Sequence, residues 1–176
     1  MANSWRDALR NGLRAVARAA RVGSRPRSRP GTTTLPRPTG HTALPDYPRR
    51  LTPVYAPRLD GEADPGEVVW TWVPFEDDPS QGKDRPVLVV GHDDPYLLGL
   101  MLTSKDHSRN IAKEARQGRH WMEIGSGGWD AQHRPSEIRL DRVLRIDPHS
   151  VRREGSVMPQ PMFEAIVASL AEVKGW

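Results

Sequence analysis

Two apolar runs around an acidic turn constrain the fold of this chain more than any other feature. The runs are PVLVV (86–90) and YLLGLMLT (96–103), and the segment GHDDP (91–95) separates them. Short, continuously apolar runs bounded by turn residues are typical of strands that are buried on both faces. The sequence therefore predicts an antiparallel hairpin at the centre of a small β fold.

Other short strands are predicted on both sides of this hairpin. EVVWTWV (67–73) is rich in β-branched and aromatic residues, and WMEI (121–124) is a shorter run of the same kind. SEIRLDRVLRI (136–146) alternates between apolar and charged residues, as a half-buried strand does. Its buried face is expected to hold Ile138, Leu140, Leu144 and Ile146.

The chain ends in a predicted helix at about residues 161–174. Pro161 suits the first helical position, and Gly175 can end the helix. One face of this helix holds Met162, Ile166, Leu170 and Val173. Several short strands followed by one terminal helix indicate a mainly β fold, a small barrel, rather than a layered α/β fold.

The N-terminal third of the chain differs from the rest in charge and composition. Residues 1–22 predict a basic amphipathic helix, and the proline-rich residues 23–65 predict a disordered linker, in which LTPVYAP (51–57) can pack on the body as an extended strip. The barrel domain is then expected at 66–176. Residues 1–59 carry twelve arginines against two aspartates, a net charge of +10. Such an arm suits nucleic acid, an anionic membrane surface or an acidic partner, or it is a solvated tail.

The composition excludes several classes of protein. The chain has no cysteine, which excludes disulfides, thiolate metal sites and a cysteine nucleophile. No apolar run approaches the roughly 20 residues that span a bilayer, and no apolar stretch of a signal peptide follows the basic N-terminus. We therefore expect a cytoplasmic protein that uses no metal and no cofactor.

The predicted hairpin also places a candidate site at its open end. If the turn is centred on Asp94, Arg85 and Thr103 each lie nine residues from it and face each other. A guanidinium beside a hydroxyl can bind a phosphoryl group and stabilise the charge that develops when a phosphodiester is attacked. RNA supplies its own nucleophile, the 2′-OH. An ordinary strand end, where Arg-Pro and Thr are common, remains the alternative interpretation.

Four segments, in this order along the chain, resemble the MazF/PemK toxins, the ribonucleases of toxin–antitoxin pairs. PGEVVWTWVPFEDDPSQGKDRPVLVVG is similar to the family's first strand, loop and Arg-Pro strand, and LMLTSK to its third strand. EIRLDRVLRID resembles a strand with an Arg-x-Ile-Asp ending, and MFEAIVASL the closing helix. The resemblance covers about residues 65–174. It implies an SH3-like barrel that forms a homodimer, a cognate antitoxin as partner, and metal-independent cleavage of single-stranded mRNA that leaves a cyclic phosphate.

The resemblance also implies roles for residues at matching positions. Arg85 is expected to act on the scissile phosphate and in proton transfer, and Thr103 to hydrogen-bond that phosphate. The loop that shapes the site is matched by Gln81, Gly82 and Pro86. Ser80 stands about where many members have Glu, and a substitute for that Glu would have to come from Asp77, Asp78 or Asp84. The basic segment 104–130 is unusually long for the family and is expected to influence RNA specificity.

Other residues near this site have two interpretations. Lys83, Lys105 and Arg109 suit contacts with phosphates, and together with Ser104 we include them among the predicted substrate-binding residues, although solvated surface charge explains them equally well. His107 is either a proton donor or acceptor at the site or a solvated loop histidine. The alternative function is a non-catalytic module that binds RNA, DNA or a protein on the same barrel, as CcdB-like proteins do.

Overall fold

The computed structural model describes residues 35–36, 43–107 and 111–176. The predicted basic helix at 1–22, most of the first half of the predicted linker, and Arg109 lie outside the described residues. No helix in the described ranges is long and apolar enough to cross a membrane.

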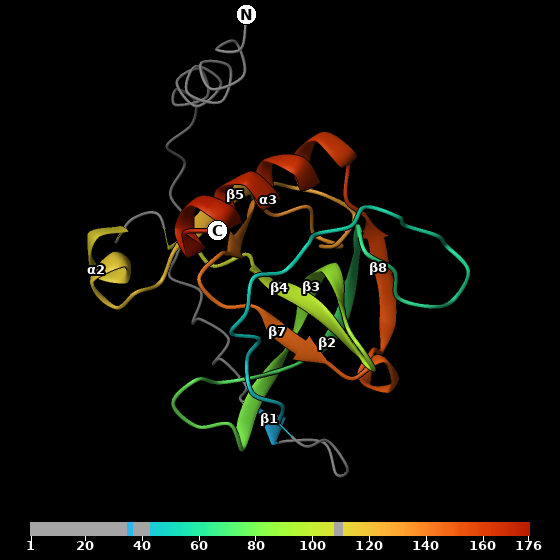
Figure 1. The fold of residues 1–176 in the computed structure, drawn as a ribbon, viewed down its shortest axis with the longest axis horizontal. Helices are drawn as coiled ribbons and strands as arrows, with labels where there is room; N and C mark the ends of the chain where they lie inside the picture. The colour runs from blue at the N-terminus through green and yellow to red at the C-terminus, as the bar shows by residue number, and fades with distance from the viewer. Residues whose placement is uncertain (1–34, 37–42, 108–110) are drawn as a thin grey trace, which may run out of the picture. The chain divides into compact units, whose positions relative to one another are not determined.

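Within the described residues, the strands form one curled antiparallel sheet (Figure 1). They are β1 (Leu35–Pro36), β2 (Glu67–Pro74), β3 (Gln81–Asp93), β4 (Tyr96–Thr103), β5 (Trp121–Gly125), β6 (Ser136–Arg139), β7 (Leu144–Ile146) and β8 (Arg153–Val157). Neighbours along the sheet run β5, β6, β4, β3, β2, β8, while β7 also pairs with β4 and β1 pairs with β3. The prediction of a mainly β, small-barrel fold with a C-terminal helix is confirmed.

The alternation of side chains along the strands gives the sheet two buried faces. The first face carries the larger core, in which helix α3 (Gln160–Lys174) buries Phe163, Ile166 and Leu170. The second face carries a smaller core made by Val69, Val73, Val87, Val89, Leu97, Met101, Leu144 and Ile146. Arg85 belongs to this second face, because it lies two residues before Val87 on β3.

Helix α3 agrees closely with its prediction from the sequence. It runs across one side of the curled sheet in Figure 1. Gly175 has a φ of 67°, the left-handed conformation that glycine adopts without strain, and its N–H is donated to the carbonyl groups of Ala171 and Glu172. Two further short helices, α2 (Ile111–Arg116) and a 3₁₀ turn (Pro148–Ser150), lie in connections between strands.

The segment 136–146 is two strands, so its prediction as a single strand is wrong. β6 ends at Arg139 and β7 begins at Leu144, and each pairs with a different part of β4. Leu140 lies in the larger core beneath α3, whereas Leu144 lies in the smaller core on the other face. The chain crosses between the two faces over residues 140–143, and an alternating pattern does not reveal such a crossing.

Residues 43–65 are called the strap here, and its residues 43–57 pack along the barrel, although the sequence placed them in a disordered linker. Tyr47 and Leu51 are buried in the larger core. Tyr55 packs against the same core and donates its hydroxyl to the carbonyl oxygen of Met158 at 2.8 Å. The expected packing of 51–57 as an extended strip is therefore observed. The high proline content predicted disorder, although large apolar residues recur at regular spacing in this segment. The folded body begins well before Gly66.

Candidate functional site

The geometry of the β3–β4 hairpin brings Arg85 level with Thr103. The hairpin turns at Asp94 and Pro95, and a count from this turn alone would set Arg85 opposite Ser104. A β-bulge at Val90 adds one residue to β3, and the register beyond it, continued along both strands, sets Arg85 opposite Thr103. The bulge thus shifts the extended register at Arg85 by one residue, from Ser104 to Thr103.

The pairing of β3 with β4 stops before it reaches these two residues. Its last pair is Val87 with Met101, after which β4 pairs with β6 through Leu102 and Thr103. On its other side, Arg85 remains paired with Thr71 of β2. β3 and β4 therefore separate at the rim of the barrel, and Arg85 lies on β3 at this point.

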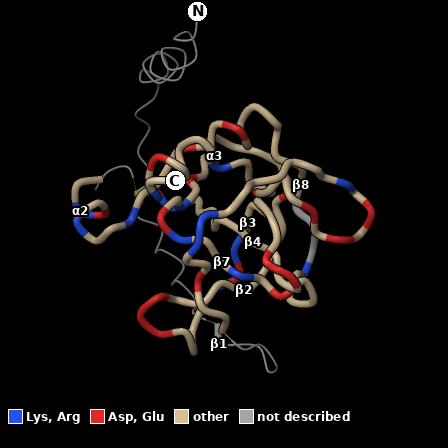
Figure 2. The backbone as a smooth tube through the Cα atoms, viewed as in Figure 1, with Lys and Arg blue, Asp and Glu red and all other residues tan. Residues whose placement is uncertain are grey.

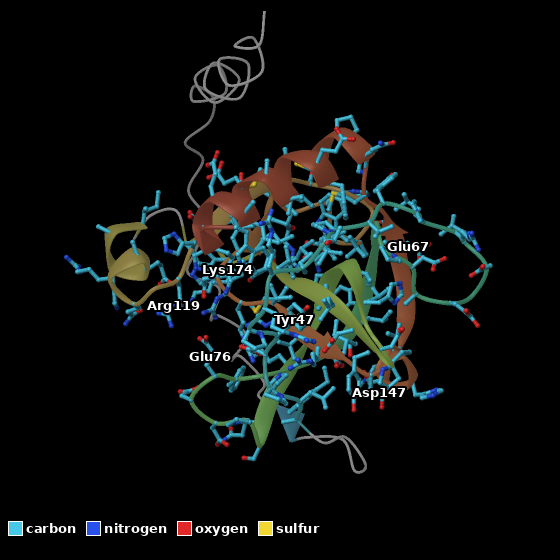
Figure 3. All side chains as sticks on the ribbon, in the orientation of Figure 1. Tyr47, Glu67, Glu76, Arg119, Asp147 and Lys174 are labelled. Carbon is cyan, nitrogen blue, oxygen red and sulfur yellow. The ribbon has the colours of Figure 1, made fainter. Side chains whose placement is uncertain are left out.

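A polar cavity lies at this rim, and Arg85 is in its wall. Residues of four segments surround it, and they include Glu76, Asp77, Lys105, His107, Glu114, Arg119, Trp121, Arg139 and Arg142. Figure 3 shows Glu76 and Arg119 on the side of the barrel that carries α2. Figure 2 shows the acidic β2–β3 loop on the same side. The cavity wall contains both basic residues and the carboxylates of Glu76, Asp77 and Glu114.

Among the described residues, none neutralises the charge of Arg85, which lines this cavity. It is half-buried, and its guanidinium has neither a carboxylate nor a hydrogen-bond acceptor among the described residues. Burial, and next the positive charges of Arg139 and Arg142, lower its pKa below the usual value. A partly desolvated cation without a counter-ion is unfavourable, and an anionic ligand would relieve this cost.

Lys83 and Lys105 add to the positive potential beside Arg85. Burial, and then the charges of Arg85 and Lys105, lower the pKa of Lys83. The mutual repulsion of these three cations would fall if a phosphodiester lay between them.

Arg139 and Arg142, in contrast, have their charges satisfied within the protein. The Arg139 side chain is 7% exposed, donates to both carboxylate oxygens of Glu76 at 2.8 and 2.9 Å, and also bonds Asp141. Although burial opposes it, hydrogen bonds with Asp141 and Glu76 raise the pKa of Arg139. Arg142 pairs with Asp46 at 2.7 Å and donates to the carbonyl oxygen of Pro74 at 2.9 Å. Both arginines therefore hold the start of the β2–β3 loop in place.

The structure places three of the ten predicted site residues in the cavity wall: Arg85, Lys105 and His107. Thr103 is not in the wall. It is 7% exposed, and its hydroxyl oxygen accepts the backbone N–H of Lys105 at 3.1 Å. In the described structure Thr103 therefore fixes the turn that carries Lys105.

The remaining predicted residues lie along β3 and the turn after β4. Gln81 is exposed and donates its amide to Asp78 at 2.6 Å. Gly82 is buried beneath Trp72, and a Cβ on it would lie 2.4 Å from the carbonyl oxygen of Val73 and 2.6 Å from the Trp72 ring. Glycine is thus required there. Three more predicted residues lie near the cavity but outside its wall. Lys83 and Pro86 are half-buried, and Ser104 is exposed.

The structure distinguishes among the acidic residues expected to replace the missing Glu at position 80. Ser80 donates both its N–H and its hydroxyl to Asp78, so Asp78 is committed to shaping the exposed loop. Asp84 accepts from Arg152 at 2.6 Å and, next to Arg85 on β3, points to the opposite face. Only Asp77 of these three lines the cavity, and among the described residues its carboxylate has no partner.

Cavity-lining residues that sequence reasoning missed include Glu76, Glu114, Arg119, Trp121, Arg139 and Arg142. Glu114, Arg119 and Trp121 belong to the basic segment 104–130, and their mutual contacts depend on how this segment folds. Arg139 was assigned to the exposed side of a single strand. Its neighbour Asp141, two residues on, was the one available signal of a paired buried arginine. No three His, Asp or Glu side chains converge as metal ligands in the described ranges.

Comparisons with known proteins identify the family of this chain. The family described as PemK-like, MazF-like toxin of type II toxin–antitoxin system matches residues 64–173. Among solved structures, a crystal structure of MazE–MazF from Deinococcus radiodurans is similar at 17% identity and a TM-score of 0.46, over 66% of this chain and 98% of that chain. No curated protein matches the sequence. Because the family match spans more than half of the chain, the protein belongs to the PemK-like, MazF-like family of toxins from type II toxin–antitoxin systems.

Proposed function

We propose that this toxin is an endoribonuclease that cleaves single-stranded mRNA without a metal ion. The observation that carries the proposal is the half-buried guanidinium of Arg85, which has no partner among the described residues and lies in a polar cavity. The chemistry that needs such a cation is the attack of the RNA 2′-OH on the adjacent phosphorus, in which negative charge accumulates on the phosphoryl oxygens. The product is a 2′,3′-cyclic phosphate and a free 5′-OH.

In this proposal Arg85 binds the scissile phosphate and takes part in proton transfer. Lys83 and Lys105 bind the same or the neighbouring phosphate, because both lie near Arg85 and carry unneutralised charge. Thr103 supports the site through Lys105 and contributes its hydroxyl to the phosphate after a small movement of that turn. Gln81, Gly82, Pro86 and Ser104 shape the approach of the RNA.

The family membership supports the rest of the biological assignment. We propose that the toxin acts in the cytoplasm as a homodimer, that it inhibits growth, and that a cognate antitoxin protein neutralises it. An antitoxin segment that carries carboxylates would suit the cavity, since it would supply the counter-charge that Arg85 lacks.

The test is cleavage of single-stranded RNA by the purified full chain in EDTA, with the RNA ends mapped on the products. Arg85→Ala is expected to reduce the rate by at least about 10²-fold, the order found when a single donor to the transition-state charge is removed. The matched control is Arg50→Ala, which removes an exposed arginine outside the cavity. Cleavage that persists in Arg85→Ala, or that requires a divalent metal ion, would reject the proposal.

A second function is favoured by one observation, the position of Thr103 outside the cavity wall. If its hydroxyl cannot reach a bound phosphate, the same barrel is a non-catalytic module that binds RNA, DNA or a protein. Intact RNA together with binding that is lost in Arg85→Ala would support this alternative.

A further inference from the structure

The ring of His107 is held in one orientation at the edge of the cavity. It stacks on the indole of Trp121 with ring centroids 4.0 Å apart and an interplanar angle of 8°. Its backbone N–H is donated to both carboxylate oxygens of Glu137 at 3.1 Å. Glu137 is buried and is the β6 partner of Thr103, so the contact ties His107 to the same rim of the barrel. A solvated loop histidine would have none of these restraints.

A carboxylate lies behind this ring. His107 Nδ1 is 3.8 Å from Glu114 Oε2, and the same oxygen accepts Arg119 Nε at 2.8 Å and Trp121 Nε1 at 3.1 Å. Although burial opposes it, the hydrogen bonds from Trp121 and Arg119 lower the pKa of Glu114, so its charge is retained. Glu114 belongs to α2, a helix that buries none of its residues. Apolar burial therefore does not hold α2, and the contacts of Glu114 are what joins it to the site.

The position of the carboxylate assigns the two ring nitrogens different tasks. Glu114 favours the tautomer in which Nδ1 carries the proton and points toward it. Nε2 is then the basic nitrogen, and it has no partner among the described residues. The ring lines the same cavity as Arg85. A base held by a third group, beside a cation that binds the reacting centre, is the arrangement that general-base catalysis requires.

We propose that His107 is the general base of the ribonuclease reaction and that Glu114 is its positioning residue. The inference rests on the proposed function and deepens it. The 2′-OH proton passes to His107 Nε2 as the O2′–P bond forms, and the P–O5′ bond breaks. The departing 5′-oxygen takes a proton from a water molecule hydrogen-bonded to Arg85, which is how Arg85 takes part in proton transfer, and His107 releases its own proton to solvent. Arg85 stabilises the phosphoryl charge throughout.

Every charged group around the ring bears on its protonation. Burial, together with the charges of Lys105 and Arg119, lowers the pKa of His107, while Glu114 opposes this change. Glu137 lies at the backbone of His107, and Arg139 lies 5.8 Å from the indole ring of Trp121. The net result is a neutral imidazole at neutral pH. The cleavage rate is therefore expected to stay level as pH falls to the usual histidine range and to decrease only below it.

The experiment is the single-turnover rate of RNA cleavage by the full chain between about pH 5 and pH 8. His107→Asn is expected to lower the rate at pH 7 by about 10²- to 10³-fold, the usual contribution of a general base, with RNA affinity within about threefold of the wild type. It should also abolish the decrease on the acidic side. Glu114→Gln, which retains the shape of the side chain, should lower the rate by about tenfold and move the acidic limb. His120→Asn is the matched control, since His120 is exposed, belongs to the same segment 104–130 and lies outside the cavity. The pH dependence of its cleavage rate should equal that of the wild type.

Three outcomes would overturn the assignment. The first is a cleavage rate of His107→Asn within about threefold of the wild-type rate, while Arg85→Ala is inactive. This result would reject His107 as the base and leave the proposed ribonuclease function standing. The second is loss of the acidic limb in Asp77→Asn instead, which would make Asp77 the base. The third does not depend on activity: ¹⁵N spectra of His107 that show the proton on Nε2 would contradict the tautomer on which the proposal depends. Inactivity of the wild-type protein would instead reject the proposed function and this inference with it.

Discussion

The strap is a part of the folded body whose contribution to stability can be predicted from one buried residue. Leu51 is 6% exposed in the larger core, whereas Val54, three residues on, is 47% exposed. Leu51→Ala removes about three methyl or methylene groups at about 0.8 kcal/mol each, or roughly 2.4 kcal/mol before any cavity cost. Measured costs for such substitutions begin near this value and reach about 5 kcal/mol. Because the strap lies at the edge of the core and can relax inward, we expect about 2.5 kcal/mol.

The assay is urea unfolding of the full chain, followed by tryptophan fluorescence. With a urea dependence of about 1.5 kcal/mol per molar, Leu51→Ala should lower the midpoint by roughly 1.7 M. Val54→Ala is the matched control and should cost less than about 1 kcal/mol, since half of that side chain is already in water. Equal midpoints for the two variants would show that the strap does not pack as described.

The same reasoning decides where the basic arm can be removed. A chain that begins at residue 43 keeps the strap and should unfold at nearly the wild-type urea concentration. A chain that begins at residue 61 loses Tyr47, Leu51 and Tyr55, and the lost burial is comparable with the total stability of a small domain. Loss of activity in the shorter chain would therefore report unfolding, and the function of the arm is tested by the longer one.

Three further predictions concern the core, acid stability and RNA binding. Gly127→Ala should destabilise the fold by about 1–3 kcal/mol in thermal unfolding, because the new Cβ would lie 2.3 Å from the Trp129 ring. An unchanged melting temperature would contradict this packing. Burial lowers the pKa of His107, so the unfolded chain binds a proton at this residue more readily than the folded chain does, and stability falls as pH drops below about 6.5. His107→Asn should reduce this loss of stability between pH 7 and pH 5. An identical loss in that variant would disprove the linkage. Lys105→Gln should reduce the slope of log affinity for single-stranded RNA against log salt by about 0.7, the value for one phosphate contact, and an unchanged slope would place Lys105 outside the RNA path.

Local patterns in the sequence predicted most of the fold. The apolar runs of β3 and β4, the mixed β-branched and aromatic run of β2, and the spacing of apolar residues in α3 each specify their element through short-range chemistry. The Arg-Pro at residues 85–86 and the threonine that ends β4 likewise marked one rim of the barrel as the place to look for a site.

The tertiary structure decided what depends on contacts between distant segments. The bulge at Val90 sets the register of β4 against the end of β3 that carries Arg85, and an extra residue in a continuously apolar strand leaves no mark in the pattern. The strap became part of the core because its large apolar residues meet α3 and Met158, which follows β8, at long range, and no local rule predicts that contact. The set of residues that forms the cavity wall likewise depends on contacts between segments that are distant in the sequence. Arg139 finds one counter-ion, Glu76, on a loop 63 residues away and another, Asp141, two residues on, whereas Arg85 finds none among the described residues, and this difference separates a structural arginine from a candidate catalytic one.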